Sequence, residues 1–210
     1  MTKSRGVLAV LSGFSGAGKG TVVKRLVEKY DNFALSISAT TRKPREGEVD
    51  GREYFFKTVE EFEDMIANKQ LIEYAKYVNN YYGTPKEFVE KMLDEGKDVI
   101  LEIELQGALQ VKEIMPDTVL IFVTPPTAEE LERRLIGRGT EDIETVNKRL
   151  ARAYEESAYM EKYDYILIND VVEDCVEDLN SIFVAEHNMV SNNQNLITSI
   201  RNEVRIFQNK

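Results

Sequence analysis

The stretch Gly13-Phe-Ser-Gly-Ala-Gly-Lys-Gly-Thr21 decides the fold of this 210-residue chain. It follows the continuous apolar run 7–11 (VLAVL), which is typical of a buried parallel strand, and it precedes residues 22–30, whose apolar residues have helical spacing. In a glycine-rich loop between a strand and a helix, consecutive N–H groups point inward at the positive end of the helix dipole and bind phosphate oxygens. The stretch therefore predicts a phosphate-binding loop, and the alternative is a tight turn that binds nothing.

Lys19 adds a mobile positive charge that reaches the outer phosphates of a nucleotide. The next residue is Gly20, although most loops of this kind carry the Mg²⁺-binding hydroxyl there, and the first hydroxyl comes at Thr21. We therefore expect Mg²⁺ to be held mainly by nucleotide oxygens, by water and by a nearby acid. The loop residues expected to contact the nucleotide are Gly13, Ser15, Gly16, Ala17, Gly18, Lys19, Gly20 and Thr21.

Further strands are expected at 98–105, 118–123 and 164–168, each beside a stretch with helical spacing. This alternation predicts an α/β fold, a doubly wound parallel sheet with helices on both faces. Two stretches interrupt it: one rich in Thr, Arg, Gly and Tyr, and one that is helical and strongly charged. The chain is therefore divided into a core (1–35, 87–127 and 158–186), an insert (36–86), a lid (128–157) and a C-terminal tail helix (187–210).

Several short patterns predict local structure. Thr58-x-x-Glu61 and Thr127-x-x-Glu130 are typical of capping boxes at helix starts, and Thr84-Pro85-Lys86-Glu87 is expected to be a third. In the tail, apolar residues at helical spacing predict a packing or oligomer-forming helix. These tail residues are Leu196, Ile200, Val204 and Phe207.

Composition excludes several classes of protein. The chain carries 27 Lys and Arg against 37 Asp and Glu, a net charge of −10, which disfavours broad binding to nucleic acid. No apolar run approaches the roughly 20 residues of a membrane span, and we expect neither membrane association nor a signal peptide.

The single Cys175 excludes an internal disulfide, fits a reducing compartment such as the cytoplasm and is expected to be buried. The single His187 is expected to be a surface residue.

The insert has the composition of an anion site. Hydroxyls and arginines are dense from Ser36 to Arg45, and Tyr54 follows them. Arginine forms forked, bidentate bonds to phosphate, and tyrosine adds a neutral donor. The alternative is a solvated basic loop.

Six ordered patterns together resemble the guanylate kinase family. They are the phosphate loop, S-x-T-T-R-x-P-R, Y-F-F, N-x-Y-Y-G-T, acidic-Ile-acidic-x-Q-G and R-L-x-x-R-G. The resemblance covers about residues 5–185, and the ordered set is far more specific than any one pattern. Here the six stand at Gly13–Thr21, Ser38–Arg45, Tyr54–Phe56, Asn79–Thr84, Glu102–Gly107 and Arg134–Gly139.

The resemblance implies a role for each matching residue. The phosphate loop and the lid arginines would hold ATP, and Asn169 at the end of 164–169 is a weaker candidate for contact with adenine. Glu102 would orient the water shell of Mg²⁺, although an acid at a strand end can also be plain surface charge. The phosphate of GMP would be held by Ser38, Arg42, Arg45, Tyr54 and Tyr82. Guanine would be read by Glu73, Thr84 and Glu104. The residues expected to act in catalysis are Lys19, Arg42, Arg134, Arg138 and Arg149.

The resemblance implies Mg²⁺-dependent phosphoryl transfer from ATP to GMP, and to dGMP, by a monomer or homodimer. Two rivals stay open: a scaffold domain that has lost catalysis, and a kinase of related fold with another acceptor. The intact phosphate loop disfavours the first, and Glu73 with Thr84 disfavours the second. The acid excess does not contradict nucleotide binding, because six acids and no Lys or Arg lie in 170–186 whereas the arginines gather in the insert and lid.

Overall fold

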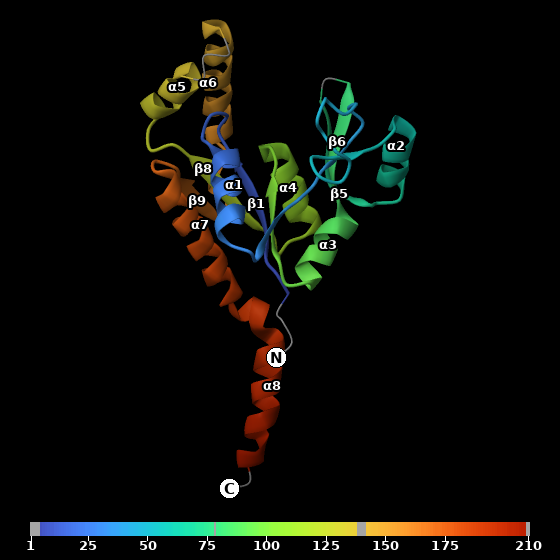
Figure 1. Ribbon diagram of the computed structural model, residues 1–210. Helices are drawn as coiled ribbons and strands as arrows, with labels where there is room; N and C mark the ends of the chain where they lie inside the picture. The colour runs from blue at the N-terminus through green and yellow to red at the C-terminus, as the bar shows by residue number, and fades with distance from the viewer. Residues whose placement is uncertain (1–4, 78, 138–141, 209–210) are drawn as a thin grey trace.

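The computed structural model describes residues 5–77, 79–137 and 142–208. Its central sheet has five strands in the order β2-β7-β1-β8-β9, all parallel (Figure 1). The phosphate loop follows β1 in the middle of this sheet, where the carboxyl ends of parallel strands meet. The strands are β1 Leu8–Gly13, β2 Phe33–Leu35, β7 Asp98–Glu102, β8 Val119–Thr124 and β9 Tyr165–Ile168.

Helices cover both faces of this sheet, which confirms the doubly wound fold. Successive side chains of β1 alternate between the faces, and Leu8 to Leu11 are at most 6% exposed. Ala9 and Leu11 pack in one hydrophobic cluster with α1 (Lys19–Lys29) and α7 (Val172–His187). Leu8 and Val10 pack in another with α3 (Lys86–Asp94) and α4 (Leu105–Ile114). A strand buried on both faces explains why the run 7–11 contains no polar residue.

A second sheet of four strands occupies the stretch predicted as the insert. Its order is β4-β3-β6-β5; β3 pairs parallel with β4 and antiparallel with β6. Helix α2 (Val59–Ala67) covers it through Phe62, which packs with Ala39 and Leu71 in a small separate cluster. The strands are β3 Ala39–Thr40, β4 Phe55–Phe56, β5 Leu71–Tyr77 and β6 Asn80–Pro85.

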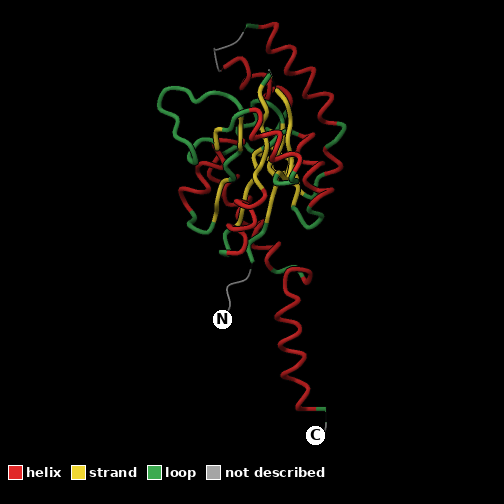
Figure 2. The backbone as a smooth tube through the Cα atoms, turned by 90° about the vertical axis from the view of Figure 1, so that its right-hand side faces the viewer, coloured by secondary structure: helices red, strands yellow, loops and turns green. Residues whose placement is uncertain are grey.

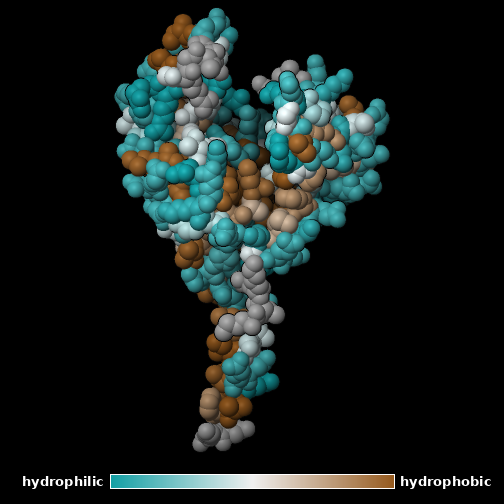
Figure 3. All heavy atoms as spheres, viewed as in Figure 1, coloured by the Kyte–Doolittle hydropathy of each residue, from teal (hydrophilic) through white to brown (hydrophobic). Residues whose placement is uncertain are grey.

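Two helices rise on the other side of the phosphate loop, α5 (Ala128–Gly137) and α6 (Ile143–Ser157). They pack on each other through Leu131, Leu135 and Val146. Figure 3 shows a hollow between this helical pair and the second sheet, above the core. The helices confirm the helical character predicted for 128–157, whereas the functional division into core, insert and lid stays a prediction.

The tail forms the short helix Val190–Asn193 and then α8 (Gln194–Val204), followed by the short helix Arg205–Phe207. Figures 1 and 2 show that α8 extends away from the rest of the molecule. The predicted helix is confirmed, and Leu196, Ile200 and Val204 are each at least half exposed on it. Among the described residues, no helix is both long enough and apolar enough to cross a membrane.

The structure confirms the predicted positions of the single cysteine and the single histidine. Cys175 is buried, as predicted, and burial raises the pKa of its thiol to about 12, so the thiol is inert at neutral pH. His187 is at the surface, as predicted, with its side chain 34% exposed, but its contact with a buried acid was not predicted. It ends α7, and its Nε2 lies 2.7 Å from Oδ1 of the buried Asp98, because α7 runs back along the sheet to the start of β7.

The predicted helix starts are partly confirmed. Both bonds of the capping box between Thr58 and Glu61 are present, and the Thr127 hydroxyl accepts a bond from the N–H of Glu130. The third prediction was wrong: α3 begins at Lys86, and the Thr84 hydroxyl donates to Glu73 instead, because Thr84 lies inside β6. The strand predicted at 98–105 also ends earlier, at Glu102, because α4 begins at 105.

We expect Gly13→Ala to lower the free energy of unfolding by about 3 kcal/mol or more, measured by urea denaturation. Gly13 has φ of +150°, and a Cβ there would lie 2.1 Å from the carbonyl oxygen of Val123 on the paired strand β8. The matched control is Gly137→Ala, where an added Cβ meets no described atom within 4 Å. Equal stability of the two variants would contradict this account of the loop.

Candidate active site

The phosphate loop connects β1 to α1 through a tight turn. The N–H of Ala17 donates to the carbonyl of Phe14 at 3.0 Å, and Gly18 caps α1 with φ of +88°, a left-handed conformation that favours glycine. Lys19 folds back over the loop, and its Nζ donates to the carbonyl oxygens of Gly13 at 2.8 Å and of Phe14 at 3.2 Å. The ammonium group is thus held at the first two residues of the loop.

Asn169 supports this loop from the core. It follows β9, is 2% exposed, and its Nδ2 donates to the carbonyl oxygen of Ala17 at 2.8 Å. A Cβ added at Gly18 would lie 2.5 Å from that nitrogen, so the asparagine packs directly on the loop. The Oδ1 atom is buried and has no hydrogen-bond partner among the described residues. Contact of Asn169 with adenine stays a prediction.

Glu102 ends β7 and faces the first turn of α1. A Cβ added at Gly20 would lie 3.6 Å from both carboxylate oxygens of Glu102, so the acid is a direct neighbour of this glycine. Surrounding protein atoms raise the pKa of Glu102 although solvent reaches its side chain, and the charge of Lys19 opposes that rise. The acid therefore lies next to the position at which loops with the usual hydroxyl carry a serine or threonine.

One arginine of the helical pair contacts the phosphate loop, and a second pairs within its own helix. Arg149 on α6 hydrogen-bonds through its guanidinium to the Ser15 hydroxyl. Arg134 on α5 pairs with Glu130, and the hydrogen bonds from Arg133 and from Arg134 lower the pKa of Glu130 to about 2. The predicted site residue Arg138 lies outside the described residues.

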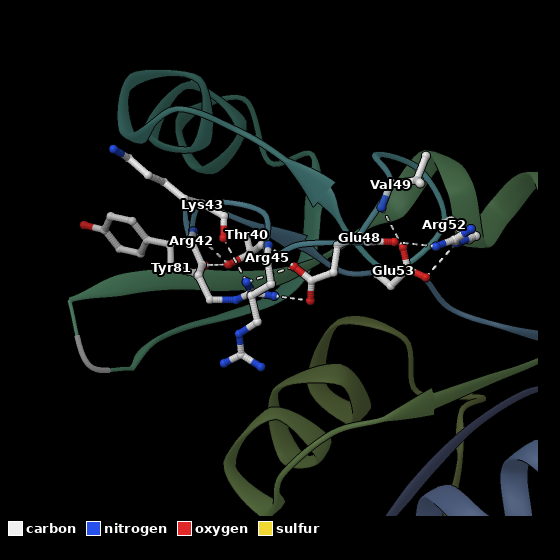
Figure 4. Close-up of polar contacts among 10 residues, drawn as sticks. Thr40, Arg42, Lys43, Arg45, Glu48, Val49, Arg52, Glu53 and Tyr81 are labelled. Atoms are coloured by element: carbon white, nitrogen blue, oxygen red, sulfur yellow. Dashed lines mark hydrogen bonds and ion pairs between the residues drawn. The ribbon is translucent and has the colours of Figure 1, made fainter.

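The residues predicted to hold a phosphate gather on the second sheet. The Arg42 guanidinium lies over the rings of Tyr54 at 5.2 Å and of Phe56 at 5.8 Å, and the Tyr54 and Tyr82 rings are 6.1 Å apart. The Ser38 carbonyl accepts a bond from Phe55 N–H, which places Ser38 beside β4. Arg45 extends into solvent from the same loop (Figure 4). The structure thus brings Arg42, Tyr54 and Tyr82 together.

The residues predicted to read a base lie on the same sheet. Glu73 on β5 is 8% exposed, and its Oε1 accepts a 2.7 Å hydrogen bond from the buried Thr84 hydroxyl on β6. Burial raises the pKa of Glu73, and the bond from Thr84 partly offsets that rise. A Cβ added at Gly107 would lie 3.2 Å from the other carboxylate oxygen, so α4 also borders this group. Thr84 and Tyr82 share one face of β6 because strand side chains alternate.

Glu104 occupies another position. It precedes α4, its side chain is mostly exposed, and its Oε2 pairs with Arg152 of α6 at 2.8 Å. Arg152 also pairs with Glu156. The structure therefore links one predicted base-reading acid to the helical pair.

Three neighbours of the site were missed by sequence reasoning. Glu48 pairs with Arg42, Gly107 makes room for Glu73, and Arg152 holds Glu104. The only available signal was local, since Glu48 lies six residues after Arg42 in a basic loop. Nothing in the spacing of the other two indicates their partners, which come from distant strands and helices.

A parallel sheet with a phosphate loop after its central strand, an arginine-bearing helical pair and a second sheet that carries Arg42 among aromatic rings define a P-loop nucleotide kinase. The family model for guanylate kinase matches residues 5–186. The chain is 54% identical over 201 residues to a guanylate kinase of Caldanaerobacter subterraneus subsp. tengcongensis, covering 96% of this chain and 98% of the relative. The chain belongs to the guanylate kinase family.

Other similar proteins agree with this assignment. A guanylate kinase of Lactococcus lactis subsp. lactis is 56% identical over 185 residues, covering 88% of this chain and 90% of the relative. The crystal structure of guanylate kinase from Anaplasma phagocytophilum matches with a TM-score of 0.69 and 36% identity, covering 90% of each chain.

Proposed function

We propose that the chain transfers the terminal phosphoryl group of ATP to GMP, and to dGMP, giving ADP and GDP or dGDP in purine nucleotide metabolism. Family membership supports the reaction, since the match extends over residues 5–186. The observation that carries the choice of acceptor is the buried pair of Glu73 and Thr84, which shares a sheet with Arg42, Tyr54 and Tyr82.

The chemistry of Glu73 suits guanine. Guanine presents an N1–H and an amino group, two donors that one carboxylate accepts. Adenine lacks this donor pair and would leave a buried carboxylate without its partners, which is costly. Thr84 already occupies one oxygen from behind, so the acid is held in one orientation before a base arrives. Glu104 pairs with Arg152, and in this proposal it is a second acceptor for the donors of guanine.

In this proposal, the phosphate of the acceptor nucleotide binds to the arginine and hydroxyl side chains on the second sheet. Arg42 supplies a planar fork of donors, while Tyr54, Tyr82 and Ser38 supply neutral hydroxyls. Arg45 lies in the same loop and adds charge when it turns inward. A phosphate monoester is already anionic, so its oxygen attacks without a strong general base.

The donor ATP binds the phosphate loop, and catalysis comes from alignment and charge stabilisation. Lys19 is held at the first two residues of the loop and balances charge on the transferred phosphoryl. Arg149 and Arg134 approach from the helical pair, and Arg138 belongs with them by its place in the family pattern. Closure of the helical pair over the loop excludes water, which competes as acceptor.

The residues near Gly20 fit Mg²⁺. Magnesium binds through one or two carboxylates together with phosphate oxygens and water, and it supplies charge neutralisation of the phosphates. Glu102 is the acid beside the loop. Among the described residues no cluster of three or more His, Cys, Asp and Glu side chains is placed to hold a metal alone. Glu102 would accept hydrogen bonds from the water shell of the ion.

The proposed reaction also implies the partners and the location of the protein. The proposed partners are ATP and GMP, with no nucleic acid and no membrane, and the protein acts in the cytoplasm as a monomer or homodimer. The acidic residues gather on α7, whereas the arginines gather on the second sheet and the helical pair. A net charge of −10 is therefore compatible with two anionic substrates.

A panel of GMP, dGMP, AMP, UMP and CMP with Mg-ATP tests the proposal. We expect turnover with GMP and dGMP, and kcat/KM at least about 100-fold lower with the other three acceptors. Turnover on no acceptor would favour a scaffold domain. Preference for another acceptor would favour a kinase of related fold.

A further inference from the structure

Glu48 joins the Arg42 side chain to the backbone of Arg45 in the loop between β3 and β4 (Figure 4). Its carboxylate accepts bonds from both terminal nitrogens of the Arg42 guanidinium, at 2.8 and 3.0 Å. One carboxylate oxygen also accepts a 2.6 Å bond from the backbone N–H of Arg45. The N–H of Glu48 in turn donates to the Arg45 carbonyl at 3.1 Å, which closes the turn.

This contact differs from the other ion pair of the same loop. The side chains of Arg42 and Glu48 are 16% and 17% exposed, whereas those of Arg52 and Glu53 are 62% and 34% exposed. The bonds from Arg42 and from Arg45 lower the pKa of Glu48, so the carboxylate is ionised at neutral pH. A two-bonded pair of this kind holds its guanidinium plane more firmly than a solvated pair.

We propose that Glu48 is a positioning residue for the acceptor phosphate, which acts by holding Arg42 and the backbone of Arg45 in their binding arrangement. The inference rests on the proposed function, because it takes the phosphate of GMP as the ligand of Arg42. Glu48 itself does not touch the substrate; it acts through its arginine partners.

The geometry indicates that Glu48 prepares Arg42 for the phosphate and does not compete with the phosphate for it. A guanidinium has five N–H donors, and Glu48 uses two of them while the Lys43 carbonyl accepts another bond from Nη1 at 2.8 Å. The remaining donors stay available to a phosphate. The rings of Tyr54 and Phe56 contact the face of the guanidinium. Carboxylate and rings together restrict the rotamers of Arg42 before the phosphate binds, so phosphate binding costs less side-chain entropy.

Glu48→Gln tests the inference in the full-length enzyme. We expect the KM for GMP to rise by about 10- to 100-fold, because the amide gives up the charge that holds the arginine fork. We expect kcat to change less than about 3-fold, and neither the KM for ATP nor the inhibition constant of guanosine, which lacks a phosphate, to move. An unchanged or lowered KM for GMP would overturn the inference, since the acid would then be inert or a competitor.

The matched control is Glu53→Gln. Glu53 also pairs with an arginine, Arg52, and also accepts a backbone bond, from Val49 at 2.7 Å, but it does not contact Arg42 in the structure. We expect its KM for GMP to stay at the wild-type value. An equal rise in both variants would overturn the inference by showing a general effect of loop charge.

A double variant separates positioning from direct binding. If Glu48 acts through Arg42, Glu48→Gln has at most a small further effect on the KM for GMP once Arg42→Met is present. Additive effects would overturn the inference. If Arg42→Met itself leaves that KM unchanged, the proposed function loses its phosphate site. If Arg42→Met raises it and Glu48→Gln does not, only the present inference fails.

Discussion

Lys19→Met is expected to reduce kcat by at least about 10³-fold while the KM for GMP stays within about 3-fold of wild type. The Nζ of Lys19 is held by the carbonyl oxygens of Gly13 and Phe14, in the loop that cradles the ATP phosphates in the proposed mechanism. Methionine keeps much of the side-chain volume and removes the charge. Steady-state kinetics with GMP varied at saturating Mg-ATP measure both constants.

The control for this variant is Lys24→Met on the same helix. Lys24 is 76% exposed and pairs loosely with Glu28 at 3.9 Å. We expect its kcat and KM to match the wild type. If Lys19→Met kept its turnover and lost affinity for GMP instead, the assigned role of the lysine would be wrong.

Glu73→Gln is expected to lower kcat/KM for GMP by about 10²- to 10³-fold and to narrow the preference for GMP over AMP. The amide still accepts the bond from Thr84, but it lacks the charge that accepts two donors from guanine. Kinetics with both nucleotides measure the change. Glu63→Gln, an exposed acid on α2 of the same part of the molecule, is the control and should behave as wild type.

The pH dependence gives this variant a second readout. Because burial raises the pKa of Glu73, the carboxylate takes up its proton at a higher pH than an ordinary glutamate. Affinity for GMP is then complete above the raised pKa and falls as the pH drops through it. Glutamine does not titrate, so the variant should lack this fall in affinity. Unchanged discrimination between AMP and GMP in the variant would show that Glu73 does not read the base.

Sequence reasoning succeeded where neighbouring residues determine the structure. The phosphate loop was predictable because strand, glycines, lysine and helix follow one another directly along the chain. The apolar run 7–11 predicted a central strand because both faces of β1 are buried. The capping box at Thr58 was predictable because both of its hydrogen bonds are local.

Sequence reasoning failed where a distant partner competes for a local pattern. Thr84 has the surroundings of a helix cap, yet Glu73 from the neighbouring strand takes its hydroxyl. His187 is at the surface, as predicted, yet its pairing with the buried carboxylate of Asp98, at the opposite end of the sheet from the phosphate loop, was missed. Pairings of this kind depend on the course of the chain in space, which local propensity does not encode.

The second sheet has a small hydrophobic cluster of its own, with Ala39, Phe62 and Leu71 at its centre. Parts of a protein with few buried apolar contacts open locally at a lower free energy than the whole molecule. We therefore expect the folding of this sheet to gain from a bound ligand. A nucleotide that contacts β3 and β6 at once binds only the folded form, so it contributes to the local stability of the sheet that recognises it. Substrate binding and the local folding of this sheet are then thermodynamically coupled.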